Sequence, residues 1–185
     1  MSEKYKVFDS NNVYFITFTL VEWIRLFHIP AYVGIIVDSI KFCQENKGLG
    51  LFGYCIMPSH IHLIARSEKQ PLGAVVRDIK KFTAYQITQK LKEDNDNMHY
   101  LNTFIETAEK TRRNKIYKVW QDGFHPEIIY SNRFFYQKLR YIHQNPVEGL
   151  MVTSQVDYMY SSARNYADLS HVLEIIYEMP QLRTH

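Results

Sequence analysis

Two histidines separated by one apolar residue are the clearest chemical feature of this sequence. His60 and His62 lie in the segment 58–64, PSHIHLI, directly after the apolar run 51–57. In a β-strand, side chains alternate between the two faces, so both imidazoles would project from one face, at positions roughly 6–7 Å apart. Two imidazoles at this spacing can bind one metal ion. The pair therefore indicates a metal site, although two polar residues on an exposed strand face would show the same pattern.

A second pair of polar side chains lies on a helix predicted over 132–145, with Ser131-Asn132 as its N-terminal cap. Tyr141 is two residues from Leu139, about 200° round the helix, and so lies away from the apolar stripe. Asn145 follows one turn later, on the face of Tyr141. A phenol can act as a nucleophile and an amide oxygen as a metal ligand. The apolar stripe itself is formed by Phe135, Leu139 and Ile142.

Tyr85 competes with Tyr141 for the role of nucleophile. It lies on a helix predicted over 71–91, away from the apolar stripe of that helix, and Gln89 follows it by four residues. Helix geometry alone does not choose between the two tyrosines. The stripe of this helix is predicted to consist of Leu72, Val75, Val76, Ile79 and Phe82.

The periodicity of apolar residues predicts the order strand, helix, strand, strand, helix, strand, helix. This order is typical of the ferredoxin-like or split βαβ plan, an α+β fold with an antiparallel sheet and helices on one face, here followed by a C-terminal helix that carries Tyr141. The first and third strands are central in that plan, so the histidine pair would lie in the middle of the sheet. The predicted strands are 13–20, 50–57, 60–66 and one within 119–129; the predicted helices are 31–44, 71–91, 132–145 and a short one near 171–178.

The 185 residues are enough for one domain, which we place at 1–185 with its core at about 10–165. Residues 92–116 are polar and charged, and are interpreted as an insertion or a mobile connection. Gly48 should end the first helix and Pro146 the tyrosine helix.

Composition limits the classes of function. The aromatic content of 15% is more than a core of this size requires, and the net charge of +3 permits a nucleic-acid partner without demanding one. Cys43 and Cys55 have neither metal-ligand nor disulfide spacing and are expected to be buried thiols. No apolar stretch is long enough to span a membrane and the N-terminus has no signal-peptide pattern, so we expect a cytoplasmic protein.

Three segments together resemble the HUH single-tyrosine transposases. Residues 60–62, HIH, resemble the histidine–bulky apolar–histidine motif of HUH single-strand endonucleases, and 53–64, GYCIMPSHIHLI, resemble the strand pair of the transposases. Residues 141–151, YIHQNPVEGLM, are similar to the tyrosine helix of the branch called REP-associated tyrosine transposases. Residues 158–163, YMYSSA, resemble a W-x-Y-S-S segment of that branch, with Tyr158 in place of Trp.

The resemblance implies a cleavage mechanism and favours Tyr141 over Tyr85. His60, His62 and Asn145 would hold magnesium or manganese on the scissile phosphate, and two imidazoles suit manganese better than magnesium. Tyr141 would attack the phosphorus and form a 5′-phosphotyrosine link, which the 3′-hydroxyl of another strand could reverse. By this resemblance the chain is a DNA-nicking and strand-transfer enzyme, a transposase. His125 is expected to make a structural hydrogen bond at a strand end, with an accessory metal or phosphate contact as the alternative. His143 points elsewhere round its helix and is expected to be non-catalytic.

The resemblance also implies a partner, single-stranded DNA with an imperfect, palindromic hairpin near the cut. Relatives are monomers or homodimers, and the short connection from Ile129 to Asn132 favours a tyrosine that acts within its own chain. Two other functions stay open: a non-cleaving protein that binds structured single strands, and a metal-dependent RNA nuclease. The candidate phosphate contacts are Arg77, Lys80, Lys81, Arg112, Arg113 and Lys115.

Overall fold

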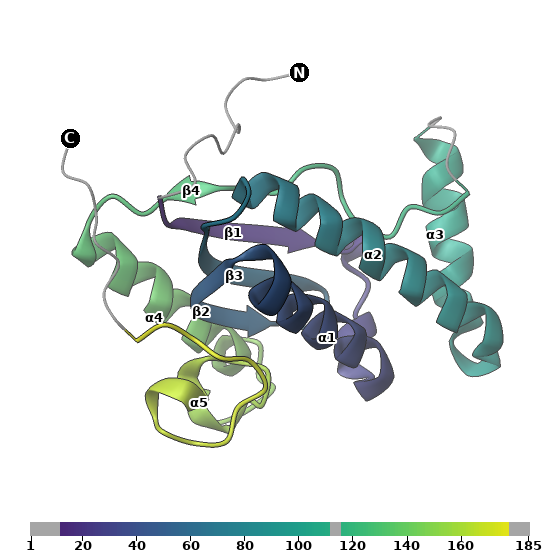
Figure 1. Ribbon diagram of the computed structural model, residues 1–185. Coiled ribbons are helices and arrows are strands. Elements are labelled where there is room, and N and C mark those ends of the chain that lie inside the picture. Colours follow the sequence, from purple (N-terminus) through teal and green to yellow (C-terminus); the bar gives the residue numbers. More distant parts are fainter. Residues whose placement is uncertain (1–11, 112–115, 178–185) are drawn as a thin grey trace.

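A four-stranded antiparallel sheet forms the centre of the protein in a computed structural model, which describes residues 12–111 and 116–177 (Figure 1). The strand order is β2-β3-β1-β4, so the first and third strands are central, as the predicted α+β plan requires. β1 and β3 pair in a register that sets Thr17 opposite His62 and Thr19 opposite His60. The strands are β1 (Tyr14–Thr19), β2 (Leu49–Ile56), β3 (His60–Ser67) and β4 (Glu127–Ile128).

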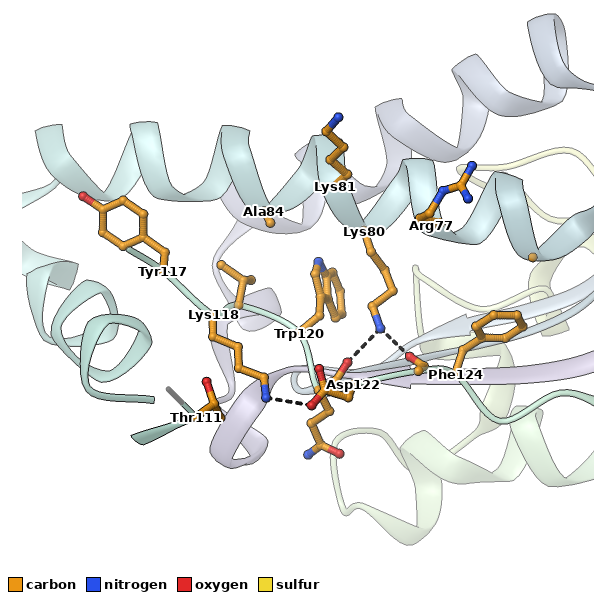
Figure 2. A pocket seen from close by; sticks show the side chains of 14 residues that line it. Arg77, Lys80, Lys81, Ala84, Thr111, Tyr117, Lys118, Trp120, Asp122 and Phe124 are labelled. Atoms are coloured by element: carbon orange, nitrogen blue, oxygen red, sulfur yellow. Dashed lines mark hydrogen bonds and ion pairs between the residues drawn. The ribbon is translucent and has the colours of Figure 1, made fainter. Parts of the chain in front are cut away.

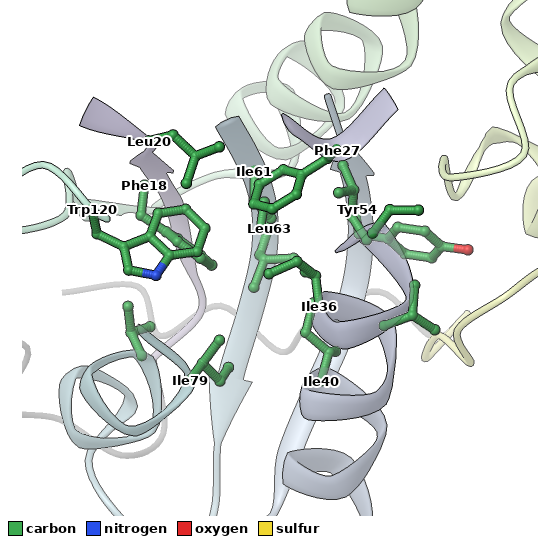
Figure 3. Packing of buried hydrophobic residues seen from close by; sticks show 14 of the residues in the cluster. Phe18, Leu20, Phe27, Ile36, Ile40, Tyr54, Ile61, Leu63, Ile79 and Trp120 are labelled. Atoms are coloured by element: carbon green, nitrogen blue, oxygen red, sulfur yellow. The ribbon is translucent and has the colours of Figure 1, made fainter. Parts of the chain in front are cut away.

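Two helices cover one face of the sheet, α1 (Pro30–Lys47) and α2 (Leu72–Glu93). The larger hydrophobic core lies beneath them, where Ile61 of β3 packs with Ile36 of α1 and Ile79 of α2 (Figure 3). Because side chains alternate along a strand, burial of the odd-numbered residues of β3 in this core turns its even-numbered residues to the other face. Gly48 ends α1 in the left-handed conformation, with φ 70°, as predicted.

α4 (Asn132–Glu148) covers the opposite face of the sheet. The predicted stripe of Phe135, Leu139 and Ile142 is buried there, and the Ser131 hydroxyl caps the helix by accepting from the amide of Phe134 at 3.2 Å. The prediction that Pro146 ends this helix is wrong, because the helix continues to Glu148. A proline so near the end removes one hydrogen bond, and the turn is closed instead by Gly149 N–H donating to the carbonyl of Asn145 at 2.8 Å.

Residues 92–116 differ from the predicted polar insertion or mobile connection. Most of the segment is helical, because α3 (Met98–Lys110) has an apolar stripe that buries Leu101 and Phe104 against the core. The Lys118 amide donates to the carbonyl of Phe104 at 3.0 Å and returns the chain to the sheet. Residues 112–115, with the candidate phosphate contacts Arg112, Arg113 and Lys115, lie outside the described residues.

The fourth strand is only two residues long, but the chain before it follows β1 for a greater distance. The amide of Gln121 donates to the carbonyl of Thr19 at 2.9 Å, and that of His125 to Thr17 at 3.1 Å. No described helix is long and apolar enough to cross a membrane. Several short helical elements complete the fold. The short elements are η2 (Val21–Trp23), η3 (Leu26–His28), η4 (Asn95–Asn97), η5 (Gln155–Asp157) and α5 (Ala163–Tyr166).

The segment after α4 covers the free edge of β2. The amide of Ile56 donates to the carbonyl of Tyr160, and that of Ser162 to the carbonyl of Tyr54, both at 2.9 Å. The predicted short helix near 171–178 is wrong over the described residues 171–177, which are irregular. These residues pack on the sheet without forming a helix, because Leu173 is buried in the core and Ile176 N–H donates to the carbonyl of Leu51. Cys43 and Cys55 are buried free thiols, as predicted.

Replacing Ser162 by Ala is expected to destabilise the fold by about 2 kcal/mol, because its fully buried hydroxyl serves several partners. It accepts from the amide of Tyr54 at 2.9 Å and contacts Nε2 of His143 at 2.8 Å. Urea unfolding of Ser162→Ala measures the change. Ser154→Ala, an exposed serine of the same segment, should differ from wild type by less than about 0.5 kcal/mol. Equal stabilities of the two variants would contradict this role of Ser162.

Candidate active site

The two histidines lie side by side at the start of β3, on the sheet face that α4 covers. Their ring centroids are 4.8 Å apart, while Ile61 between them is fully buried in the opposite core. The alternation of side chains along β3 is thus the direct cause of their proximity. The imidazole of His60 also contacts the Ser59 hydroxyl through Nδ1 at 3.0 Å.

His62 has one ring nitrogen that is bonded and one that is not. Its side chain is 3% exposed, and Nδ1 lies 2.7 Å from the Thr17 hydroxyl on the neighbouring strand. Nε2 is buried and has no hydrogen-bond partner in the protein. When Nδ1 donates its proton to Thr17, Nε2 presents its lone pair, which is the arrangement of a metal-binding histidine.

Both imidazoles are neutral at physiological pH. Burial, followed by the charges of the neighbouring His60 and Lys138, lowers the pKa of His62 to about 3. Burial also lowers the pKa of His60. A buried site favours the uncharged form of an imidazole, and only that form binds a metal ion.

Tyr141 of α4 lies directly against the histidines of its own chain. Its ring centroid is 5.3 Å from that of His62 and 6.1 Å from that of Phe15. The side chain is 46% exposed, so one side of the ring contacts the site while the other faces solvent. This arrangement follows from the buried stripe of α4, since seating Leu139 and Ile142 on the sheet brings Tyr141 to the flank of the helix that borders His62.

Asn145 lies one turn further along α4 and is half-buried. Its Nδ2 is buried without a hydrogen-bond partner, so exchanging the amide nitrogen and oxygen by rotation would break no bond of Nδ2. Four buried side-chain atoms are unpartnered in this way among the described residues, and two of them belong to His62 and Asn145. Buried polar atoms left without partners are costly, which fits two residues that await a ligand.

The candidate donors are the two neutral imidazoles of β3 and the carboxamide of Asn145 on α4. No three His, Cys, Asp or Glu side chains cluster as a metal site within 12–111 and 116–177. Nitrogen and oxygen donors with no thiolate suit first-row divalent ions such as Mn²⁺, and the carboxamide also suits Mg²⁺.

One known protein is similar to this chain in sequence, and another is similar in fold. A Haemophilus influenzae protein provisionally named a REP-associated tyrosine transposase is 25% identical over 162 residues, which cover 88% of this chain and 85% of that protein. The structure of a REP-associated tyrosine transposase bound to a REP hairpin matches with a TM-score of 0.64 and 16% identity, over 100% of this chain and 98% of that chain.

The chain resembles the REP-associated tyrosine transposases. No family model matches the sequence. A provisionally named transposase of Deinococcus radiodurans R1 shows a weaker likeness, with a TM-score of 0.43 and 14% identity over 77% of this chain and 97% of that chain. The α+β fold of this chain is that of the REP-associated tyrosine transposase structure.

Tyr85, the other candidate nucleophile, lies on the side of the sheet opposite the histidines. α2 belongs to the layer that covers the other face, and Tyr85 is 60% exposed on its outer surface. It lines a groove of about 680 Å³ between α1 and α2 together with Phe42 and Phe82. The prediction that Phe82 belongs to the buried stripe is wrong, since it is 52% exposed and Thr83 is buried in its place.

The candidate phosphate contacts of α2 are also separated from the histidines. Arg77, Lys80 and Lys81 border a pocket of about 630 Å³ between α2 and the segment 117–124 (Figure 2). The ammonium of Lys80 donates to the carbonyls of Gln121, at 2.8 Å, and Gly123. Lys80 thus connects α2 to the edge of the sheet, whereas Arg77 and Lys81 are exposed.

His125 was expected to be structural and His143 non-catalytic, and the structure places His143 away from the histidine pair. His143 is buried, and its Nε2 contacts the Ser162 hydroxyl at 2.8 Å. Burial lowers its pKa to about 4, so it is a neutral part of the packing between α4 and the following segment. His125 lies in the edge segment, where its backbone pairs with β1.

Two neighbours of the histidines were missed by sequence reasoning. Thr17 faces His62 because of the register of β1 with β3, and no local pattern encodes that register. Trp23 is 59% exposed and its ring lies 5.5 Å from that of His60. An isolated tryptophan after a strand has no spacing that would mark it, and only the folded chain sets it beside the site.

Proposed function

We propose that this chain is a metal-dependent endonuclease and strand transferase for single-stranded DNA, which cuts near hairpins with Tyr141 as its nucleophile. One observation carries the proposal: the Tyr141 ring lies 5.3 Å from that of the buried His62, whose Nε2 has no partner. A nucleophile beside unsatisfied metal-binding donors is the minimum set for metal-assisted attack on a phosphodiester.

His60, His62 and Asn145 are the residues that would hold magnesium or manganese. A divalent ion bound there supplies Lewis-acid chemistry, by polarising a phosphoryl oxygen and offsetting the charge that develops on it. Burial lowers the pKa of both histidines and so favours the uncharged, metal-binding form, and the pKa of about 3 keeps His62 in that form well below neutral pH.

Tyr141 performs the covalent step. Its phenolic oxygen loses a proton and attacks the phosphorus, the bond from phosphorus to the 3′ oxygen breaks, and that oxygen leaves as a 3′-hydroxyl after taking up a proton. The product is a 5′-phosphotyrosine, which conserves a phosphodiester-type bond. The 3′-hydroxyl of another strand can therefore reverse the step without a nucleoside triphosphate and so join two strands.

The proposed substrate is single-stranded DNA that carries a hairpin. The similar fold of a REP-associated tyrosine transposase that was solved bound to a REP hairpin supports this choice, as does the 25% identical relative of the same name. The 46% exposure of Tyr141 leaves the nucleophile open to a strand of DNA.

A denaturing gel tests the proposal directly. The protein is incubated with Mn²⁺ and hairpins copied from the palindromes that flank its gene, labelled at the 3′ end, because a 5′-phosphotyrosine link retains the downstream fragment. We expect a labelled band at the mass of protein plus fragment. Hairpins that bind without forming this band would instead favour the non-cleaving binding protein, and adducts or cleavage with RNA alone would favour the RNA nuclease.

Thr17→Val is expected to weaken Mn²⁺ binding by about ten- to a hundredfold, because it removes the partner of His62 Nδ1 that orients the ring. Isothermal titration calorimetry with MnCl₂ measures the affinity. Thr17→Ser keeps the hydroxyl and should bind Mn²⁺ as wild type does. If the valine and serine variants bind Mn²⁺ equally well, Thr17 has no part in positioning His62.

A further inference from the structure

The solvent face of α4 carries a row of side chains suited to nucleic acid. Arg133, Tyr136, Arg140 and Gln144 follow one another at intervals of three or four residues, so they form a single stripe along the helix, hereafter the α4 stripe. Each of them is exposed, Tyr136 to 54%. They line a shallow groove of about 610 Å³ that runs along α4 and also includes Tyr141.

The cations of this stripe are available for a ligand. Neither Arg133 nor Arg140 forms an ion pair with any described residue, and the groove contains one acidic side chain, Glu148 at its far end. Lys138 on the same helix differs, since its ammonium pairs with Glu127 at 2.8 Å and lies 4.3 Å from the centre of the Phe15 ring. Unpaired guanidinium groups beside an exposed aromatic ring are a typical binding surface for single strands.

We propose that the α4 stripe binds the single-stranded segment next to the cleaved phosphate, with Arg133 and Arg140 on backbone phosphates and Tyr136 stacked on a base. This inference rests on the proposed function, because it assigns the strand a path along the helix that bears the nucleophile. The two arginines are seven positions apart, which is about 10 Å along the helix axis, so they contact different phosphates of one strand.

Fluorescence anisotropy with a labelled twelve-nucleotide oligo-dT tests the stripe in a Tyr141→Phe background with EDTA, where no cleavage occurs. Arg133→Gln/Arg140→Gln should weaken binding at least about tenfold and reduce the slope of log affinity against log salt by about 1.4, two contacts of about 0.7 each. The matched control, Lys41→Gln/Lys90→Gln, removes the same charge from exposed positions of α1 and α2 and should stay within about twofold. Tyr136→Ala should weaken binding about fivefold and Tyr136→Phe should not.

Equal losses in the two double variants would show that only net charge matters and would overturn the proposal, as would unchanged binding in both. The result also separates this inference from the proposed function. If stripe variants bind normally while the wild-type protein forms the Tyr141 adduct, only the inference fails. If the stripe binds oligo-dT as expected but no hairpin gives an adduct, only the proposed cleavage fails.

A second observation concerns the other side of the histidine pair. Glu22 and Trp23 both have positive φ, 52° and 53°, which is uncommon for residues other than glycine and costs about 1–3 kcal/mol at each. This backbone holds the Trp23 indole in solvent beside His60 rather than in the core. Ring contacts then run from Trp23 through His60 and His62 to Tyr141.

We infer that Trp23 stacks on a base at the end of the site away from α4. The chain has two tryptophans, and Trp120 is 6% exposed with its indole N–H donating to Thr83 at 3.2 Å, so a strand can reach Trp23 alone. Titration with unlabelled oligo-dT should quench tryptophan emission in wild type and leave it unchanged in Trp23→Phe. Quenching that persists in Trp23→Phe, or saturated binding without quenching in wild type, would overturn this assignment.

Discussion

Tyr141→Phe is expected to abolish the covalent protein–DNA adduct and to lower hairpin cleavage by at least about a thousandfold. The loss follows from chemistry alone, because phenylalanine keeps the ring and lacks the attacking oxygen. The Tyr141 side chain is partly exposed and its hydroxyl donates no hydrogen bond to a described residue, so the variant should fold as wild type does. Denaturing gels with the 3′-labelled hairpin measure the adduct and the cleaved fragment together.

Tyr85→Phe is the matched control for this result. Tyr85 is exposed to a similar degree and also lies on a long helix, but α2 packs on the sheet face opposite His60 and His62. Adduct formation and cleavage by Tyr85→Phe should equal those of wild type. An adduct that survives in Tyr141→Phe and disappears in Tyr85→Phe would refute the assignment of the nucleophile, whatever the substrate.

His62→Gln is expected to lower Mn²⁺ affinity by at least about a hundredfold and to reduce cleavage to the level seen in EDTA. The imidazole supplies the only buried ring nitrogen without a partner in the described part of the chain, and glutamine cannot place a neutral nitrogen lone pair at the same point. In wild type, EDTA should stop cleavage and added Mn²⁺ should restore it. Calorimetry with MnCl₂ gives the affinity independently of any DNA substrate.

His143→Gln separates metal binding from loss of a buried imidazole. His143 is as deeply buried as His62 and also has a lowered pKa, but its ring contacts Ser162 and not the histidine pair. We expect His143→Gln to lose stability and to keep the Mn²⁺ affinity of wild type. Equal Mn²⁺ affinities in His62→Gln and wild type would remove the basis for a metal centre at β3.

The spacing of residues within single segments was sufficient to predict most helices and strands. It was also sufficient to predict which site residues share a face of one element. The alternation of residues 60–66 predicts a strand, and the same alternation places His60 and His62 on one face. Gly48 and Ser131 predict helix ends by their residue type. Gly48 can adopt the left-handed backbone conformation that ends α1, and the Ser131 hydroxyl can accept from an amide of the first turn of α4. Tyr141 and Asn145 could likewise be placed on one side of a helix, because helical spacing relates residues only to others on the same helix.

Predictions from the spacing of neighbouring residues failed where packing between distant segments determines the secondary structure. The polar composition of 92–116 suggested an insertion, yet three or four apolar residues of α3 suffice to seat that helix once a core is present. Pro146 was predicted to end α4, but the end of the helix depends on the turn that follows it. Residues 171–177 form no helix, because Leu173 is buried in the core and Ile176 bonds to the edge strand β2.

The sequence by itself thus determined the order of the elements other than α3, the shared face of the two histidines and the shared face of Tyr141 and Asn145. Only the tertiary structure decided which tyrosine meets the histidines, because α2 and α4 have similar local patterns and differ in the side of the sheet on which they pack. The register of β1 with β3 likewise decided that Thr17 faces His62. Periodicity relates residues that are close in the sequence, whereas a site formed by two elements depends on how those elements pack against each other in the folded chain.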